Sequence, residues 1–116
     1  MRYAMIITGD ESHWFGPAVE SGLMDQVDAW WEKWHQAGKI VRGGAELDRS
    51  TKARTVGPGP DGPVVTDGPF LELKEVVGGF VLLEADDMDA AVEVAAGWPG
   101  IAHGDRIEVR PVITRE

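Results

Sequence analysis

The order of strand-like and helix-like hydrophobic patterns restricts the fold of this chain more than any other feature of its sequence. Apolar runs of strand length end at turn-forming residues, whereas two longer stretches place their apolar residues at helical spacing. The expected strands are Tyr3–Thr8, Lys39–Leu47, Arg54–Val56, Pro63–Thr66, Gly79–Ala85 and Arg106–Thr114, and the expected helices run from about Ser21 to Gly38 and from Asp86 to Ala96. Without the short hairpin formed by the third and fourth strands, the order is β-α-β-β-α-β. We therefore expect an α+β, ferredoxin-like fold with an inserted hairpin.

The first expected helix carries a broad aromatic face made by Trp30, Trp31 and Trp34. Ser21 is a suitable N-cap for this helix, and Gly38 is well placed to end it. Core packing is the usual role of such a face. A tryptophan stripe that faces a cleft would instead suit a flat aromatic ligand, so Trp31 and Trp34 are candidate ligand-binding residues.

The central strands predict that one chain alone does not cover its sheet. Two helices cover one face of a four-stranded sheet, yet Met5–Ile7 and Phe80–Leu83 are apolar at consecutive positions, which indicates burial on both faces. A second copy of the sheet would cover the other face, so we expect a homodimer with its two sheets packed together. The alternative is that the hairpin and loops fold back over the sheet within one chain.

Composition excludes several classes of function. The 116 residues suffice for one domain, expected to span the whole of 1–116. Acidic residues outnumber basic ones 20 to 11, which argues against a nucleic-acid or anionic-membrane partner. The absence of cysteine excludes disulfides, thiolate metal sites and thiol nucleophiles. There is no secretory signal, no apolar segment of the roughly 18 residues that a membrane helix needs and no nucleotide motif, so we expect a cytoplasmic protein without a cofactor.

The stretch from Thr66 to Phe80 holds most of the candidate chemistry. Asp67 begins a Gly-Pro turn, and in an extended chain Phe70, Glu72 and Lys74 beyond it share one side. A carboxylate near a lysine and an aromatic ring can act as a general base with an electrostatic partner, so Asp67, Glu72 and Lys74 are candidate catalytic residues and Phe70 a candidate ligand contact. The alternative, which we favour, is an edge hairpin with solvated charges and Phe70 as its anchor.

Two histidines lie in loops where they could take part in chemistry. His103 precedes the last strand in a glycine-rich loop and is a candidate acid or base. Asp10, Glu11 and His13 could form a metal corner after the first strand, although a polar loop over the sheet end is the favoured interpretation and no metal is expected. Trp14, Phe15 and Trp98 are also expected in loops, which indicates an aromatic-lined pocket.

The pattern VTDGPF-x-E-x-K-E-x-x-GGF at Val65–Phe80 resembles the signature of the DGPF branch of the YCII-related proteins. The likeness extends over essentially the whole chain, because it includes the first strand ending in GDE, the helix ending before GG-x-x-L and the closing EVRPV. It implies a dimeric α+β-barrel type of ferredoxin-like fold with a pocket between helix, sheet and the DGPF segment. Some DGPF proteins are associated with extracytoplasmic-function sigma factors, and a relative in the wider family is a dehydrochlorinase.

The wider family also has a His–Asp pair as its candidate catalytic dyad, and this sequence departs from it. The resemblance places the histidine at Val27 and the aspartate at Trp98, so neither partner is present. Two hypotheses follow. The first is a small-molecule-binding or regulatory module, with a sigma factor as a possible partner. The second is a cofactor-independent enzyme, lyase or dehydrochlorinase-like, that acts on a small aromatic or polar metabolite.

Overall fold

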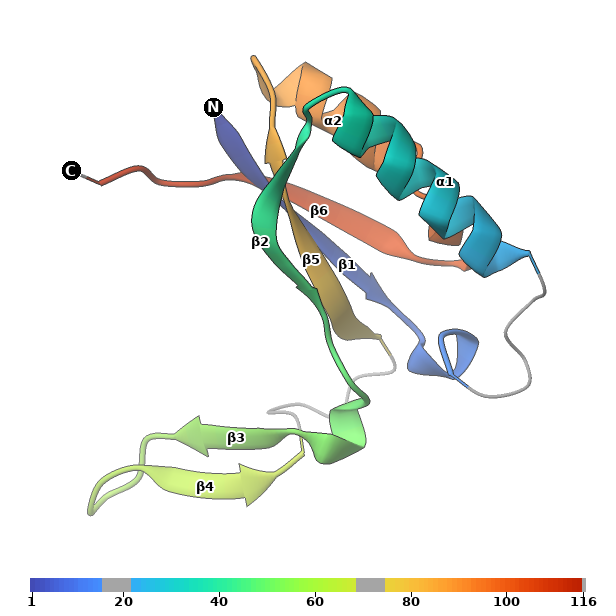
Figure 1. Cartoon of the computed structure of the whole chain (residues 1–116). Coiled ribbons are helices and arrows are strands. Elements are labelled where there is room, and N and C mark those ends of the chain that lie inside the picture. The colour runs from blue at the N-terminus through green and yellow to red at the C-terminus, as the bar shows by residue number, and fades with distance from the viewer. Residues whose placement is uncertain (16–21, 69–74, 116) are drawn as a thin grey trace.

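Figure 1 shows the protein as a computed structural model, which describes residues 1–15, 22–68 and 75–115. The strands are β1 (Arg2–Gly9), β2 (Ile40–Glu46), β3 (Arg54–Gly57), β4 (Val64–Asp67), β5 (Val76–Glu84) and β6 (Arg106–Pro111). The helices are α1 (Leu23–Gln36) and α2 (Met88–Ala96), with short 3-10 turns η1 (Glu11–His13), η2 (Ser50–Lys52) and η3 (Pro99–His103). No helix within these residues is long and apolar enough to cross a membrane.

The main sheet has four antiparallel strands in the order β2-β5-β1-β6, and β3 and β4 form a separate two-stranded sheet. Each helix connects two strands of the main sheet that have one other strand between them, and both helices lie on the same face (Figure 1). This α+β arrangement is compatible with the ferredoxin-like fold expected from the sequence.

Element boundaries follow local chemistry closely. Asp87 caps α2, because its carboxylate accepts a 2.8 Å hydrogen bond from the backbone N–H of Ala90. Gly38 follows α1 in the left-handed conformation at φ +72°, as expected for a helix end. Gly22 stands at the N-cap of α1, and the expected cap Ser21 lies outside the described residues.

The glycine pair in β2 interrupts its pairing with β5. The register between β2 and β5 shifts between Val41 and Ala45, around Gly43 and Gly44. Gly43 has φ +123°, which favours glycine, and a Cβ on Gly44 would overlap the carbonyl oxygen of Phe80. The backbone conformation at Gly43 and the close approach of β5 at Gly44 therefore each favour glycine.

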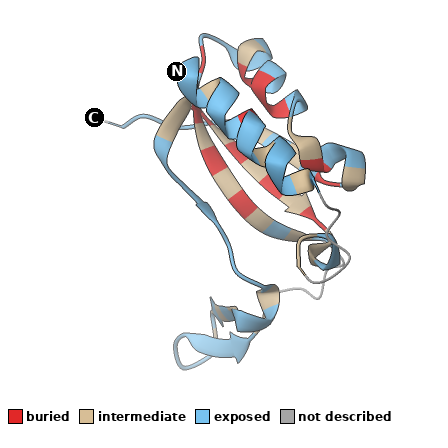
Figure 2. Cartoon of the chain, turned by 45° about the vertical axis from the view of Figure 1, so that its right-hand side comes forward, coloured by how far each residue is buried: buried red, intermediate tan, exposed pale blue. Residues whose placement is uncertain are grey.

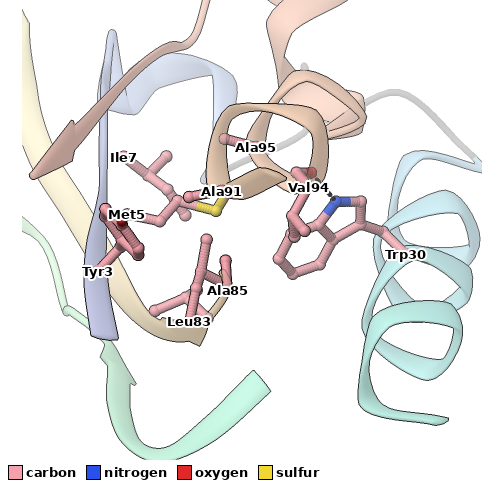
Figure 3. Close-up of a cluster of buried hydrophobic side chains, with 10 residues drawn as sticks. Tyr3, Met5, Ile7, Trp30, Leu83, Ala85, Ala91, Val94 and Ala95 are labelled. Atoms are coloured by element: carbon pink, nitrogen blue, oxygen red, sulfur yellow. Dashed lines mark hydrogen bonds between the residues drawn. The ribbon is translucent and has the colours of Figure 1, made fainter. Parts of the chain in front are cut away.

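The hydrophobic core lies between the sheet and the two helices (Figure 3). Its largest fully buried side chains are Met5, Leu83, Val81 and Val94. Trp30 joins the helices, since its indole Nε1 donates a 3.0 Å hydrogen bond to the carbonyl oxygen of Val94. The core interpretation of the aromatic helix face is therefore confirmed for Trp30.

The second face of the sheet is also apolar at its centre. Along β1 and β5, buried residues alternate with half-buried ones (Figure 2). Ile6 pairs with Phe80, and Ala4 pairs with Leu82, and all four side chains are half-buried on the face away from the helices. Beside them on β6, Glu108 and Arg110 form an ion pair of 3.7 Å, so this face combines an apolar centre with a charged edge.

The β3–β4 hairpin extends away from the main body (Figure 1). Its Val56, Val64 and Val65 side chains are 64%, 47% and 58% exposed. The radius of gyration of the chain is 16.1 Å, whereas a compact chain of this length has about 13 Å. An isolated two-stranded hairpin is marginally stable in water, so this element depends on the contacts at its base.

Those contacts join η1 to the residues around η2. Glu11 accepts hydrogen bonds from both the backbone N–H and the hydroxyl of Ser50, the first of them at 2.9 Å. The Arg49 guanidinium lies 4.8 Å from the centre of the Phe15 ring. The loop after β1 therefore holds the base of the hairpin in place.

Candidate functional site

A cavity of about 320 Å³ lies between α1 and the end of the sheet where β1 ends and β5 begins. The residues lining it are the aromatic Trp14, Phe15, Trp31 and Trp98, the aliphatic Ile7, Leu23, Met24, Val27, Ala45, Leu47 and Val81, the polar His13, Glu46 and Asp105, the glycines Gly44, Gly78, Gly79 and Gly100, and Phe80, whose side chain lies on the other face of the sheet. The wall is therefore mostly aromatic and aliphatic, with a small number of polar groups, which is typical of a small-molecule site.

Asp105 is the one charged side chain among the described residues that is buried, at 7% exposure. It stands just before β6, and its two carboxylate oxygens accept hydrogen bonds from two different indoles. Trp14 Nε1 donates to Oδ1 and Trp98 Nε1 donates to Oδ2, each at 3.0 Å. One carboxylate thus holds together the loop after β1 and the turn after α2.

Three glycines leave the space that this cluster occupies. A Cβ on Gly9 would lie 2.5 Å from Asp105 Oδ1, and one on Gly78 would lie 2.6 Å from the Trp14 ring. A Cβ on Gly100 would overlap Oδ2 of Asp105 and lie 2.7 Å from Trp98 Nε1. The cluster of Trp14, Trp98 and Asp105 therefore fits only because the three backbone positions beside it are glycines and carry no side chain.

His13 lines the cavity with a defined tautomer. Its Nδ1 lies 3.0 Å from the carbonyl oxygen of His103. A carbonyl oxygen only accepts, so Nδ1 carries the proton in this contact, and Nε2 of the neutral ring is an acceptor. His13 can therefore accept a proton through Nε2.

Of the four catalytic candidates from the sequence, the structure describes Asp67 and His103, and neither lines this cavity. Asp67 ends β4, and its side chain is 95% exposed and forms a 3.6 Å ion pair with Arg54. The side chain of His103 is not among the cavity-lining groups, although its carbonyl positions His13. Glu72 and Lys74 lie outside the described residues.

The ligand-binding candidates divide between the cavity and the core. Trp31 lines the cavity and packs edge-to-face on Trp30 at 5.4 Å. Trp34 is half-buried against the core, with the ammonium of Lys33 lying 4.7 Å from its ring centre. Phe70 lies outside the described residues. The expectation that Trp14, Phe15 and Trp98 line a pocket agrees with the cavity.

The residues of the possible metal corner have separate partners. Asp10 accepts hydrogen bonds from the N–H and hydroxyl of Ser12, Glu11 binds Ser50, and His13 faces the His103 carbonyl. Within the described ranges, no group of three histidine or carboxylate side chains could hold a metal ion. The polar-loop interpretation describes these residues better.

Of the polar cavity residues His13, Glu46 and Asp105, the sequence pointed only to His13, and only as part of a possible metal corner. Asp105 lies 91 residues from Trp14 and 7 from Trp98, and no local periodicity links these three positions. The sequence indicates a role for Asp105 only indirectly, because this aspartate ends the glycine-rich stretch GIAHGD directly before a strand.

Comparisons with known proteins place the chain in a family. The model of the YCII-related domain matches residues 1–115. An uncharacterised protein of Rhizobium meliloti (strain 1021) is 32% identical over 97 residues, which cover 82% of this chain and 77% of the relative. The chain belongs to the YCII-related family.

Proposed function

We propose that this protein is a small-molecule-binding module whose ligand is a flat aromatic compound held in the cavity beneath α1. The observation that carries the proposal is the lining: Trp14, Trp31 and Trp98 come from three separate segments and meet around one cavity of about 320 Å³. That volume is at the small end of the range of about 300 to 1,000 Å³ that is usual for ligand sites. Aromatic walls favour flat rings through stacked and edge-to-face contacts.

The position of the cavity adds support. The resemblance places the family's histidine and aspartate at Val27 and Trp98, and both of these residues line the cavity. This chain keeps the concave site but replaces the two proton-transfer groups with an aliphatic and an aromatic side chain. That exchange favours binding over dyad chemistry.

A matched pair of probes tests the proposal. Benzamide and cyclohexanecarboxamide carry the same amide on a flat and a puckered ring of equal size, and calorimetry or ligand-detected NMR can measure the binding of each. We expect benzamide to bind more tightly, because only the flat ring can stack on the indoles. Val27→Phe should weaken its binding by filling the cavity, whereas Val92→Phe, on the exposed side of α2, should not. Equal binding of both probes, or equal effects of both variants, would refute the proposal.

A second candidate function, cofactor-independent proton transfer, is favoured by His13. His13 lines the cavity, and its Nδ1 contact with a carbonyl oxygen leaves Nε2 of the neutral ring as the acceptor that a general base needs. The flat carbon acid 5-nitrobenzisoxazole tests this, because removal of its ring C–H proton breaks the N–O bond and releases a coloured phenolate. Turnover that disappears in His13→Gln supports catalysis, and a rate equal in wild type and variant excludes this role for His13.

We also propose a homodimer that packs the second faces of two sheets together. The half-buried Ile6 and Leu82 at the centre of that face support it, as do the exposed valines of the protruding β3–β4 hairpin. Ile6→Asp should convert the dimer to a monomer in sedimentation equilibrium, and Val92→Asp on α2 should leave it unchanged. A wild-type chain that sediments as a monomer at micromolar concentration would contradict the dimer.

Placement in the DGPF branch is proposed on the motif at Val65–Phe80, with which the features quoted from the rest of the chain agree. Association with a sigma factor is implied by that branch and stays a prediction. Purification of the chain with and without a co-expressed sigma factor would test it, since a stable complex should elute earlier in gel filtration.

A further inference from the structure

We infer that the cavity selects aromatic ligands that carry a cationic or hydrogen-bond-donating group, and that the Asp105 carboxylate is the residue that selects them. The inference rests on the proposed binding function and names the chemical class of its ligand. Amidines, amines and ring N–H donors belong to this class, and aromatic carboxylates are outside it.

The first argument is hydrogen-bonding capacity. An ionised carboxylate can accept about four hydrogen bonds, two at each oxygen. Asp105 receives one from Trp14 at Oδ1 and one from Trp98 at Oδ2. Asp105 lines the cavity, so a ligand donor can use the capacity that remains on either oxygen.

The second argument is charge. Within the described part of the chain, no cationic side chain forms an ion pair with Asp105, and its hydrogen-bond donors are two neutral indoles. A buried carboxylate without a cation is costly, and two neutral donors offset that cost only in part. A ligand cation would complete the compensation beside a carboxylate that is itself 7% exposed, where a charge-assisted hydrogen bond is stronger than in water.

The third argument is geometric. Trp14 and Trp98 use their N–H groups to hold Asp105 and also line the cavity with their rings. A flat ligand that contacts these rings therefore lies beside the carboxylate that they position. A negative group placed there would face the carboxylate at close range, without a cation from the described residues between them.

Three probes of one shape measure the selection. Benzamidine, benzamide and benzoate differ in charge from positive through neutral to negative on the same ring. We expect binding to fall in that order, with benzamidine at least about tenfold tighter than benzoate, a difference equal to about one charge-assisted hydrogen bond. The order should persist in about 1 M salt, where charges are screened beyond roughly 3 Å, because Asp105 is in direct contact with the ligand.

Matched variants assign the selection to Asp105. Asp105→Asn and Glu93→Gln each remove one negative charge, but Glu93 is exposed on α2 away from the cavity. The preference for benzamidine should fall to about threefold or less in Asp105→Asn and stay unchanged in Glu93→Gln. If Asp105→Asn does not fold, a second measurement follows the indole N–H resonances of the wild-type protein by NMR. Benzamidine should then shift the N–H resonances of Trp14 and Trp98 more than benzamide does, because it shares their carboxylate.

The outcomes separate the two proposals. Equal binding of benzamidine and benzoate, or a preference that vanishes in salt, overturns the role of Asp105 and leaves aromatic binding intact. A preference that is lost equally in Glu93→Gln shows that net charge, not Asp105, is responsible. No binding of any of the three probes overturns the binding function together with this inference.

Discussion

Alanine at Gly100 should disrupt the carboxylate–indole cluster at the wall of the cavity. Its Cβ would overlap Oδ2 of Asp105 and lie 2.7 Å from Trp98 Nε1 and 2.8 Å from Asp105 Cγ. Asp105 is only 7% exposed and is held by a second indole at Oδ1, so the carboxylate has little room to move. The methyl group can therefore fit only if the bond from Trp98 to Asp105 breaks or the turn after α2 shifts.

Two contributions set the magnitude. Overpacking of a well-filled interior costs about 1 to 3 kcal/mol, and a buried hydrogen-bonding group left without its partner costs about 1 to 3 kcal/mol. We expect the free energy of unfolding to fall by about 3 kcal/mol. For a domain of this size, that corresponds to a decrease in Tm of about 10 °C.

The assay is urea denaturation followed by tryptophan fluorescence, with Gly57→Ala as the matched control. A Cβ on Gly57 meets no atom within 4 Å, and alanine in a strand is more favourable than glycine by about 0.5 to 1 kcal/mol. The control should therefore be neutral or slightly stabilising. If Gly100→Ala changes the free energy of unfolding by no more than the control, the cluster is not packed as described.

Three further predictions concern the cap of α2, the base of the hairpin and the Asp48–Lys52 contact. Asp87→Ala should destabilise the protein by about 1 kcal/mol through loss of the cap on α2, and Asp86→Ala should not. Thermal unfolding measures both variants. An equal loss of stability in the two would contradict the assignment of the cap. Glu11→Gln removes an acceptor for Ser50 at the hairpin base and should lower the stability of the hairpin by about 1 kcal/mol. Hydrogen exchange should then be faster at the amides of Arg54–Gly57 and unaffected in β5. Unchanged exchange would show that Glu11 does not hold the hairpin. The hydrogen bond from Lys52 lowers the pKa of Asp48, so this contact should persist at neutral pH and be lost as pH falls through that lowered pKa. In Lys52→Met, NMR titration should show the pKa of Asp48 rising toward its ordinary value. No rise would contradict the assigned cause.

Local chemistry made most of the fold predictable. Helical spacing located α1, and the aspartates before Met88 located the start of α2. The last strand is shorter than predicted, because its pairing with β1 ends at Tyr3 and Pro111, after which one further hydrogen bond joins the Val112 N–H to the Arg2 carbonyl oxygen. Strand length here depends on the partner strand, which alternation within one segment does not show.

The candidate site was less predictable, because its groups meet only in three dimensions. The loop tryptophans indicated an aromatic pocket, since loop positions offer them no helix face to pack. The charged residues of the motif at Val65–Phe80 were the main catalytic candidates, yet Asp67 is exposed on the hairpin. Asp105 had no such motif, and its burial depends on the empty space at Gly9, Gly78 and Gly100. Glycines that make room for a distant side chain do not occur at a fixed spacing from it, so the sequence alone does not reveal them.

The indole N–H signals of the five tryptophans test the central claim most directly. Heteronuclear NMR can follow each signal while benzamide is added, with assignments from single Trp→Phe variants. If the ligand enters the cavity, Trp14, Trp31 and Trp98 should shift together along one saturable curve, while Trp34, which packs against the core, should stay in place. Shifts that spare the three cavity tryptophans, or that affect Trp34 equally, would contradict a binding site in this cavity.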